Sequence, residues 1–234
     1  MSELLQRIAR NVNAVRERIA AAARRSGRAP EEITLVAVTK YVDADITRLF
    51  PDAGCHVLGE SRPQQLWEKA AAIQDQRIRW HMIGHLQRNK VRRTLPVVSC
   101  IESVDSLALI EVLEREATRI DRRLHVLLEV NVSGDLAKHG FAPADAVGLA
   151  PRLGDWDHLE FTGLMTMAAR ASDAESARDD FATLRRLRDQ MQQQCPPGVE
   201  LSDLSMGMSR DFETAIEEGA TIVRVGSALV AGAV

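Results

Sequence analysis

Length, composition and charge already exclude several classes of function. The chain has 234 residues, of which 45% are hydrophobic and 27% are charged, and its formal net charge is -3. This is the composition of a soluble globular protein that can bury a large core. Because the chain is almost neutral, its overall field would not attract nucleic acid or an anionic membrane, and we expect neither as a partner.

The first 27 residues predict an amphipathic helix that packs on the rest of the domain. Its apolar stripe consists of Leu4, Leu5, Ile8, Val12, Val15 and Ile19. Charged residues interrupt the segment throughout, which argues against a signal peptide and against a membrane span. Glu3 and Glu17 also count against an arginine-rich transit peptide.

The chain contains three cysteines, Cys55, Cys100 and Cys195, which are far apart and form no CxxC or Cys/His ligand motif. An odd number of widely spaced cysteines is typical of reduced thiols and not of a disulfide framework or a zinc site. We therefore expect a cytoplasmic protein without a structural metal.

Eight apolar segments rich in β-branched residues follow the first helix. They span residues 33–40, 56–60, 78–84, 97–104, 125–132, 159–167, 201–207 and 221–230. Helical periodicity appears between them, most clearly over residues 106–120, 176–194 and 210–220. Apolar strands that alternate with amphipathic helices indicate a parallel sheet covered by helices.

Eight such units predict an α/β fold of the (β/α)8 TIM-barrel class, with an extra N-terminal helix and a single domain over residues 1–234. A doubly wound open sheet is the alternative, because periodicity alone does not show that a sheet closes. No GxGxxG motif follows any predicted strand, so the main sequence evidence for a Rossmann domain is missing.

Lys40 ends the first apolar segment, "ITLVAVTK". Active sites of such barrels form at the carboxyl ends of the strands, where this lysine would lie. An ammonium group is costly there unless it is solvated, paired or used chemically, and a neutral amine could form a Schiff base with a carbonyl compound. The alternative is a lysine that extends its amine to the surface.

Arg224 is the second unusual charge, because it lies inside the apolar segment "TIVRVGSALV". Strand alternation puts Ile222, Arg224 and Gly226 on one face of the strand. A buried arginine needs a fixed partner. That partner is either a carboxylate, such as Glu60 or Glu129, or an acceptor on a ligand.

Glycines and serines follow the seventh and eighth predicted strands, the position where barrels of this class bind phosphate through backbone amides and a helix N-terminus. The candidate phosphate-binding residues are Ser205, Gly207, Met208, Ser209, Gly226 and Ser227. The alternative is that these glycines only make tight turns. Ser209 or Asp211 is expected to cap the next helix, and Gly219 to end it.

A lysine, an arginine and a phosphate-binding loop could together surround a planar phosphorylated aldehyde such as pyridoxal phosphate (PLP). Three segments carry a resemblance that fits this ligand. "LVAVTK", "WHMIGHLQRNK" and "LSMGMSRDFETAIEEGATIVRVGSALVAG" resemble the pyridoxal-phosphate homeostasis protein family, and the similarity covers essentially the whole chain.

The resemblance implies a role for each candidate residue. Lys40 would carry PLP as an internal aldimine, and Arg224 would face the ring nitrogen. Ser209, Gly226 and Ser227 would hold the phosphate. The fold would be a single-domain version of the alanine racemase barrel. The protein would store PLP or deliver it to apo PLP-dependent enzymes, with little or no turnover.

Two enzymatic alternatives stay open. The first is a small PLP-dependent amino-acid racemase, although Tyr41, the one tyrosine in the chain, is adjacent to Lys40 and poorly placed as an opposing base. Arg224 would also leave the pyridine nitrogen unprotonated and weaken the ring as an electron sink. The second is a Schiff-base aldolase that acts on a sugar phosphate. Without the second racemase domain, we expect a monomer.

Four further residues lie near the predicted site or depart from the family pattern. Ser61 stands where the family often has asparagine, and His85 where it often has proline. His81 and His85 are four residues apart, but they fall across a strand end, so packed histidines are expected and no metal site. Lys138 follows the fifth predicted strand and would be an accessory lysine near the cofactor.

Overall fold

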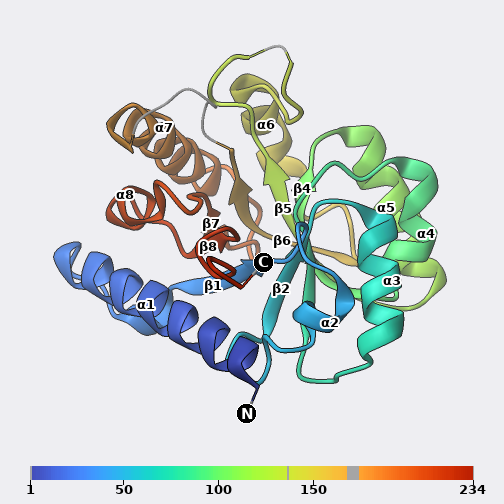
Figure 1. Cartoon of the computed structure of the whole chain (residues 1–234). Coiled ribbons are helices and arrows are strands. Elements are labelled where there is room, and N and C mark those ends of the chain that lie inside the picture. The colour runs from blue at the N-terminus through green and yellow to red at the C-terminus, as the bar shows by residue number, and fades with distance from the viewer. Residues whose placement is uncertain (1, 136, 168–173, 234) are drawn as a thin grey trace.

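Eight parallel strands form a closed barrel in chain order (Figure 1). The structure is a computed structural model, and it describes residues 2–135, 137–167 and 174–233. The strands are β1 (Thr34–Val38), β2 (Val57–Glu60), β3 (Arg79–Met82), β4 (Val98–Val104), β5 (Leu124–Glu129), β6 (Leu159–Met165), β7 (Asp203–Ser205) and β8 (Ile222–Val225). The prediction of a (β/α)8 barrel is confirmed, and the pairing of β1 with β8 removes the open-sheet alternative.

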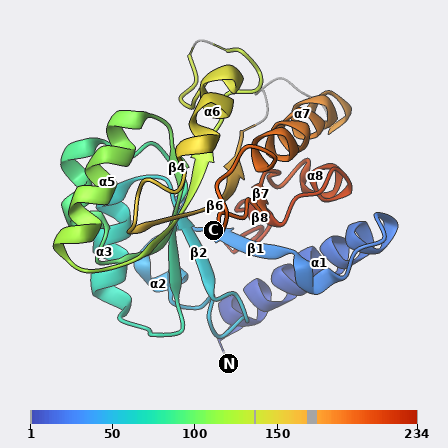
Figure 2. The same cartoon turned by 180° about the vertical axis from the view of Figure 1, so that it is seen from behind.

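Helices surround the strands, as the views from both sides show (Figures 1 and 2). They are α1 (Glu3–Arg25), α2 (Ala44–Thr47), α3 (Pro63–Ile73), α4 (Val91–Thr94), α5 (Leu107–Arg119), α6 (Pro143–Leu149), α7 (Ala174–Gln192) and α8 (Phe212–Glu217). Short 3-10 turns cover Pro30–Glu32, Arg88–Lys90 and Ala150–Arg152. The helices predicted over residues 106–120, 176–194 and 210–220 correspond to α5, α7 and α8.

The extra helix α1 packs beside α8. Its predicted stripe is buried except for Leu4, which is half-buried. Arg18 on α1 forms a 3.0 Å ion pair with Glu213 on α8. Asn11 donates hydrogen bonds to the carbonyls of Leu229 and Ala231, at 3.1 and 3.0 Å. Among the described residues, none of the helices is both long and apolar enough to span a bilayer.

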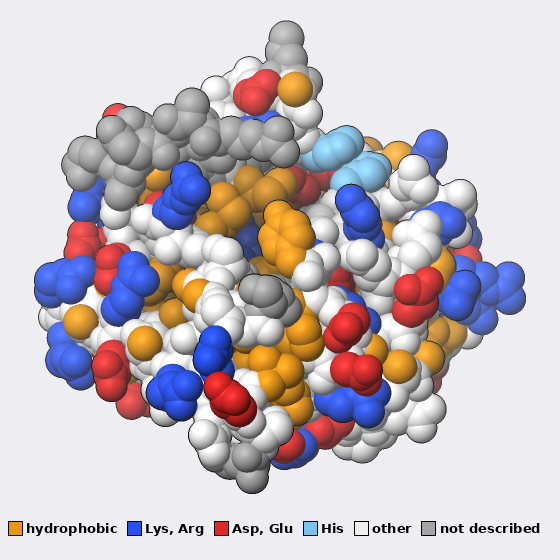
Figure 3. Space-filling view, viewed as in Figure 1, with side chains coloured by type: hydrophobic (Ala, Val, Ile, Leu, Met, Phe, Trp, Pro, Cys, Tyr) orange, Lys and Arg blue, Asp and Glu red, His pale blue; other side chains and the backbone are white. Residues whose placement is uncertain are grey.

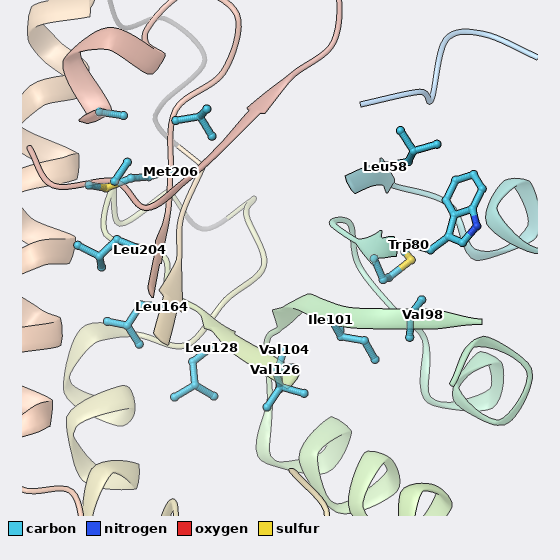
Figure 4. Close-up of a cluster of buried hydrophobic side chains, with 14 of the residues drawn as sticks. Leu58, Trp80, Val98, Ile101, Val104, Val126, Leu128, Leu164, Leu204 and Met206 are labelled. Carbon is cyan, nitrogen blue, oxygen red and sulfur yellow. The ribbon is translucent and has the colours of Figure 1, made fainter. Parts of the chain in front are cut away.

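Two apolar layers follow from the alternation of side chains along the strands. One side of the strands points into the barrel and contributes Val36, Val38, Val57, Ile83, Cys100, Leu127, Met165 and Ile222. The other side packs against the helices in a larger core, of which Figure 4 shows Leu128, Leu164, Leu204 and neighbouring side chains. Polar side chains on the inner face are therefore held inside the barrel by their strand register.

The two ends of α8 test the predicted cap residues of this helix. Gly219 follows the helix with a φ of +102°, a left-handed conformation that suits glycine. Asp211 occupies the N-cap position, but its side chain makes no capping hydrogen bond to the helix. Its Oδ1 instead accepts a 2.5 Å hydrogen bond from the backbone amide of Met208. Asp211 therefore fixes the loop between β7 and α8.

Candidate functional site

Lys40 lies just after β1, at the end of the barrel where the carboxyl ends of the strands meet. We call this end the mouth. Val36 and Val38 point into the barrel, and Lys40 continues the same alternation two residues later. Its side chain is half-buried, and its Nζ lies 4.9 Å from the centroid of the Tyr41 ring. Lys40 makes no hydrogen bond or ion pair with the residues that the structure describes. The amine is therefore available to a ligand in the mouth.

A buried ion pair supports the backbone behind Lys40. Lys69 on α3 and Glu60 at the end of β2 form a short ion pair, and both are buried. The Thr39 hydroxyl donates to Glu60 at 2.6 Å, and Lys69 donates to the Thr39 carbonyl at 2.7 Å. These three residues fix the position of the peptide that precedes Lys40. They also show that Glu60 is not the partner of Arg224.

Arg224 points into the barrel from β8, as the strand alternation predicts. Ile222 belongs to the inner apolar cluster, and Val223 and Val225 belong to the outer core. The guanidinium of Arg224 donates to the Ser205 hydroxyl and, at 2.7 Å, to the Thr166 carbonyl. Burial lowers the pKa of Arg224, and the carboxyl groups of Glu102 and Glu129 oppose this shift. The guanidinium is thus held by the neighbouring strand β7 and by the residue that follows β6.

Glu102 on β4 is the carboxylate nearest to Arg224, at 3.8 Å between Oε2 and Nη1. Its other oxygen lies 2.6 Å from Nδ1 of His81. Burial pushes the pKa of the Glu102 carboxyl upward, but the hydrogen bond to His81 and the charge of Arg224 hold that pKa below its ordinary value. An ionised carboxylate only accepts hydrogen bonds, so Nδ1 of His81 carries the proton between them. His81 is packed inside the site, as expected, whereas the same expectation is wrong for His85, which is 41% exposed.

Glu129 ends β5 on the inner side of the barrel and is 3% exposed. Burial, together with the charge of Asp105, raises the pKa of Glu129 to about 7, against the lowering effects of Arg224 and His85. This carboxyl group can therefore hold a proton near neutral pH.

The loops after β7 and β8 meet at the mouth, next to the end of β1. The backbone amide of Gly226 donates a 3.3 Å hydrogen bond to the Ser209 hydroxyl. A Cβ atom at Gly226 would lie 3.1 Å from the Val38 carbonyl oxygen, so this position requires a close backbone approach. Ser227 is exposed beside it, and Met208 is 40% exposed. The structure thus brings these loop residues to the same end of the barrel as Lys40.

Two other members of the predicted phosphate loop differ in their surroundings. Gly207 is buried, with a φ of +90°, and its carbonyl accepts from the Arg224 amide at 3.0 Å. Ser205 is fully buried, and its hydroxyl donates to Glu102 at 2.6 Å and accepts from Arg224. Ser205 therefore belongs with the arginine inside the barrel, and its role toward phosphate stays a prediction.

Lys138 lies in the loop after β5, where its Nζ donates to the Ser133 hydroxyl and the Met167 carbonyl, each at 3.0 Å. Ser61 packs closely on the backbone of Gly84, whose Cβ would lie 2.4 Å from the Ser61 carbonyl oxygen. An accessory role for Lys138 and the effect of Ser61 on a cofactor contact both stay predictions.

Sequence reasoning missed Glu102 and Lys69. Glu102 had a usable signal, because it is the one charged residue in the apolar segment 97–104. Lys69 had none, since a lysine on an amphipathic helix is normally solvated.

A cavity of ≈ 860 Å³ lies beside His85 and Asp105, and Lys40 and Arg224 are not among its lining residues.

Comparison with known proteins places this barrel in a class of known domains. Residues 5–233 match the family model described as "Alanine racemase, N-terminal domain". Pyridoxal phosphate homeostasis proteins from Aquifex aeolicus and Pseudomonas aeruginosa are 39% and 37% identical to the chain. The first match covers 92% of this chain and 93% of the relative, and the second 95% and 94%.

A solved structure extends this likeness. PipY of Synechococcus elongatus PCC7942, determined with PLP bound, superimposes with a TM-score of 0.84 at 34% identity, over 95% of this chain and 99% of PipY. The chain belongs to the pyridoxal phosphate homeostasis protein family.

Proposed function

We propose that this chain binds PLP covalently through Lys40 and maintains the supply of the cofactor with little catalytic turnover. The observation that carries the proposal is the free Lys40 amine at the mouth of a barrel that also holds Arg224. Relatives that share at least 37% identity over most of both chains are named pyridoxal phosphate homeostasis proteins, and PipY was solved with PLP.

The residues of the mouth fit the chemical groups of PLP. PLP supplies an aldehyde that a neutral lysine amine can attack with loss of water. Arg224 can donate toward an unprotonated ring nitrogen, because an arginine keeps its proton in proteins. Ser209 and Ser227 offer hydroxyl groups, and the Ser209 hydroxyl is positioned by the backbone amide of Gly226. Phosphate binding at this loop is part of the proposal.

The geometry favours a carrier over a racemase. A racemase needs a second acid or base opposite the lysine. Tyr41 is the one tyrosine of the chain, and it is 72% exposed next to Lys40. Arg224 is paired with Glu102 and Ser205, so its proton is held firmly. The aldolase alternative gains no support, because a sugar phosphate leaves the buried arginine without a function.

Delivery of PLP to apo enzymes, a monomeric state and a cytoplasmic location complete the proposal. Tyr41 and Met208 give the mouth an exposed apolar rim that a recipient could contact. Figure 3 shows hydrophobic side chains gathered in a hollow on this face. The three cysteines are unpaired, which fits a reducing compartment. Size-exclusion chromatography with light scattering tests the monomer, and transfer to an apo enzyme in the presence of a PLP trap tests delivery.

The first experiment is an absorbance spectrum of the purified protein, followed by borohydride reduction and peptide mass mapping. We expect a long-wavelength band and a reduced PLP adduct on the peptide that contains Lys40. Lys40→Ala should lose both, whereas Lys138→Ala, which changes a lysine at the same mouth, should keep the adduct. A protein that takes up no added PLP would contradict the proposal. Turnover of an amino acid, lost in Lys40→Ala, would instead favour the racemase.

A further inference from the structure

A second group of side chains at the barrel mouth has the composition of a metal site. Among the described residues, His85, Asp105 and His139 each place a possible ligand atom within 4.8 Å of the others. His85 follows β3, Asp105 follows β4, and His139 lies in the loop between β5 and α6. Successive strands of one barrel end therefore supply the three residues. Figure 3 shows histidine side chains together at the surface of this face.

The two imidazole rings converge on one carboxylate oxygen. Nδ1 of His85 lies 2.6 Å from Oδ2 of Asp105, and Nδ1 of His139 lies 3.8 Å from the same atom. The rings stack with centroids 4.0 Å apart and planes inclined by 12°. The other carboxylate oxygen accepts a 3.2 Å hydrogen bond from Ser106, which orients the Asp105 side chain. Ligands of metals are commonly oriented in this way.

Asp105 is a shielded carboxylate, and in the part of the chain that the structure describes it forms no ion pair with a lysine or an arginine. Its side chain is 7% exposed, and among the described residues it contacts the two histidines and the Ser106 hydroxyl. Carboxylates that are removed from water require a positive partner or several hydrogen bonds. Two histidines and a hydroxyl offer few hydrogen bonds, and a divalent cation held between the histidines and Asp105 would supply the positive partner.

We propose that His85, Asp105 and His139 bind a divalent transition-metal ion of the Zn²⁺ type. Two imidazole nitrogens and one carboxylate oxygen are ligands that Zn²⁺ prefers, at about 2.0–2.2 Å. Tetrahedral bonds of that length place ligand atoms about 3.3 Å apart. The observed spacings of 2.6 and 3.8 Å bracket this value. Rotation of the exposed histidines, 41% and 58% exposed, would open the stack around an ion.

The ion would have access from solvent and would leave one position for water or another ligand. His85 and Asp105 line the cavity of ≈ 860 Å³, which also includes Arg88 and Asn89. Since His139 directly follows Lys138, metal binding would tie the loop that carries Lys138 to the ends of β3 and β4. The proposal is independent of PLP chemistry, because none of its ligands is Lys40 or Arg224.

The test is a titration of Zn²⁺ into the untagged, PLP-loaded full chain by calorimetry, together with Co²⁺ absorption spectroscopy. We expect one ion per chain and a Co²⁺ spectrum without a thiolate band, which excludes binding through Cys195. His139→Asn and His85→Asn should each weaken Zn²⁺ binding about tenfold or more. His139 is exposed, so its replacement should not impair folding, and thermal denaturation checks this.

His125→Asn is the matched control. His125 is also an exposed histidine beside a carboxylate, 3.5 Å from Glu160, but it lacks a second histidine. Its replacement should leave Zn²⁺ affinity unchanged. The proposal is overturned if the unmodified chain binds no Zn²⁺ in the micromolar range, or if His139→Asn binds as tightly as the unmodified chain. Either result would make the cluster a hydrogen-bonded contact between loops.

Discussion

The ammonium of Lys69 donates a 2.7 Å hydrogen bond to the carbonyl of Thr39, the residue directly before Lys40. The same ammonium is paired with Glu60, and the second oxygen of Glu60, Oε2, is buried without a partner among the described residues. The position of Lys40 is thus coupled to the buried ion pair of Lys69 and Glu60. This coupling can be measured.

Lys69→Met should destabilise the protein strongly, because it leaves the Glu60 carboxylate buried without its cation. Removal of one partner from a buried ion pair typically costs about 3–5 kcal/mol. Urea denaturation measures the loss, and the rate of PLP uptake reports the displaced Lys40. The double variant Glu60→Gln with Lys69→Met should recover part of the stability, since no uncompensated charge remains. Equal stability of Lys69→Met and the unmodified chain would show that the pair is energetically unimportant.

The stability of the protein should fall as the pH rises through about 7 because of Glu129. Its carboxyl group has a pKa of about 7 in the folded chain, raised from 4.5 by burial and by Asp105, against Arg224 and His85. Between these values the folded state binds more protons than the unfolded state. The stabilisation by the protonated Glu129 is therefore complete below about pH 4.5, and it is lost as the pH rises from there through about 7. The loss is roughly 3 kcal/mol for a shift of this size.

Glu129→Gln removes this dependence. Urea denaturation at pH 5 and pH 8.5, with EDTA present, should show a smaller loss of unfolding free energy for Glu129→Gln than for the unmodified chain. The other titrating groups are common to both proteins, so the difference isolates Glu129. Parallel pH profiles would mean that Glu129 titrates in the folded chain as it does in water.

Ser205 and Ser209 should respond differently to replacement by alanine. Ser205→Ala removes a buried hydroxyl between Arg224 and Glu102, and we expect a loss of about 1–3 kcal/mol of unfolding free energy. Ser209→Ala should change stability little and weaken PLP binding. Fluorescence titration with PLP and chemical denaturation separate the two effects. If Ser205→Ala weakens PLP binding without any loss of stability, its hydroxyl acts on the phosphate after all.

Two glycines offer a test of the loop after β7. A Cβ at Gly207 would lie 2.6 Å from the Ala215 side chain, in a backbone with a φ of +90°. Gly207→Ala should therefore lower the free energy of unfolding by about 1–3 kcal/mol. Gly148 lies in α6 with open space around its Cβ position. Gly148→Ala is the control and should stabilise by about 0.5–1 kcal/mol. Thermal denaturation compares both, and a neutral Gly207→Ala would show that the loop is not tightly packed.

The barrel and two of its charges could be predicted because each has a local signal. Lys40 and Arg224 interrupt apolar strands, and period-two alternation fixes the side on which Arg224 points. The pairing of Arg224 with Glu102 had no such signal, because the choice among strand carboxylates depends on how the barrel closes. Lys69 and His139 lie on a helix and in a loop, where neither polarity nor spacing distinguishes a buried or converging side chain from a solvated one.

The contact of Asn11 with the C-terminal segment limits the order in which the chain can fold during synthesis. Its hydrogen bond to Leu229 joins residues 218 positions apart, so α1 can complete its packing only after almost the whole chain has left the ribosome. Contacts of such long range form late and slowly. The loop of Gly226 and Ser209 depends on the same final segment. The proposed phosphate contacts thus become available only when synthesis is nearly finished, so a nascent chain would acquire its cofactor last.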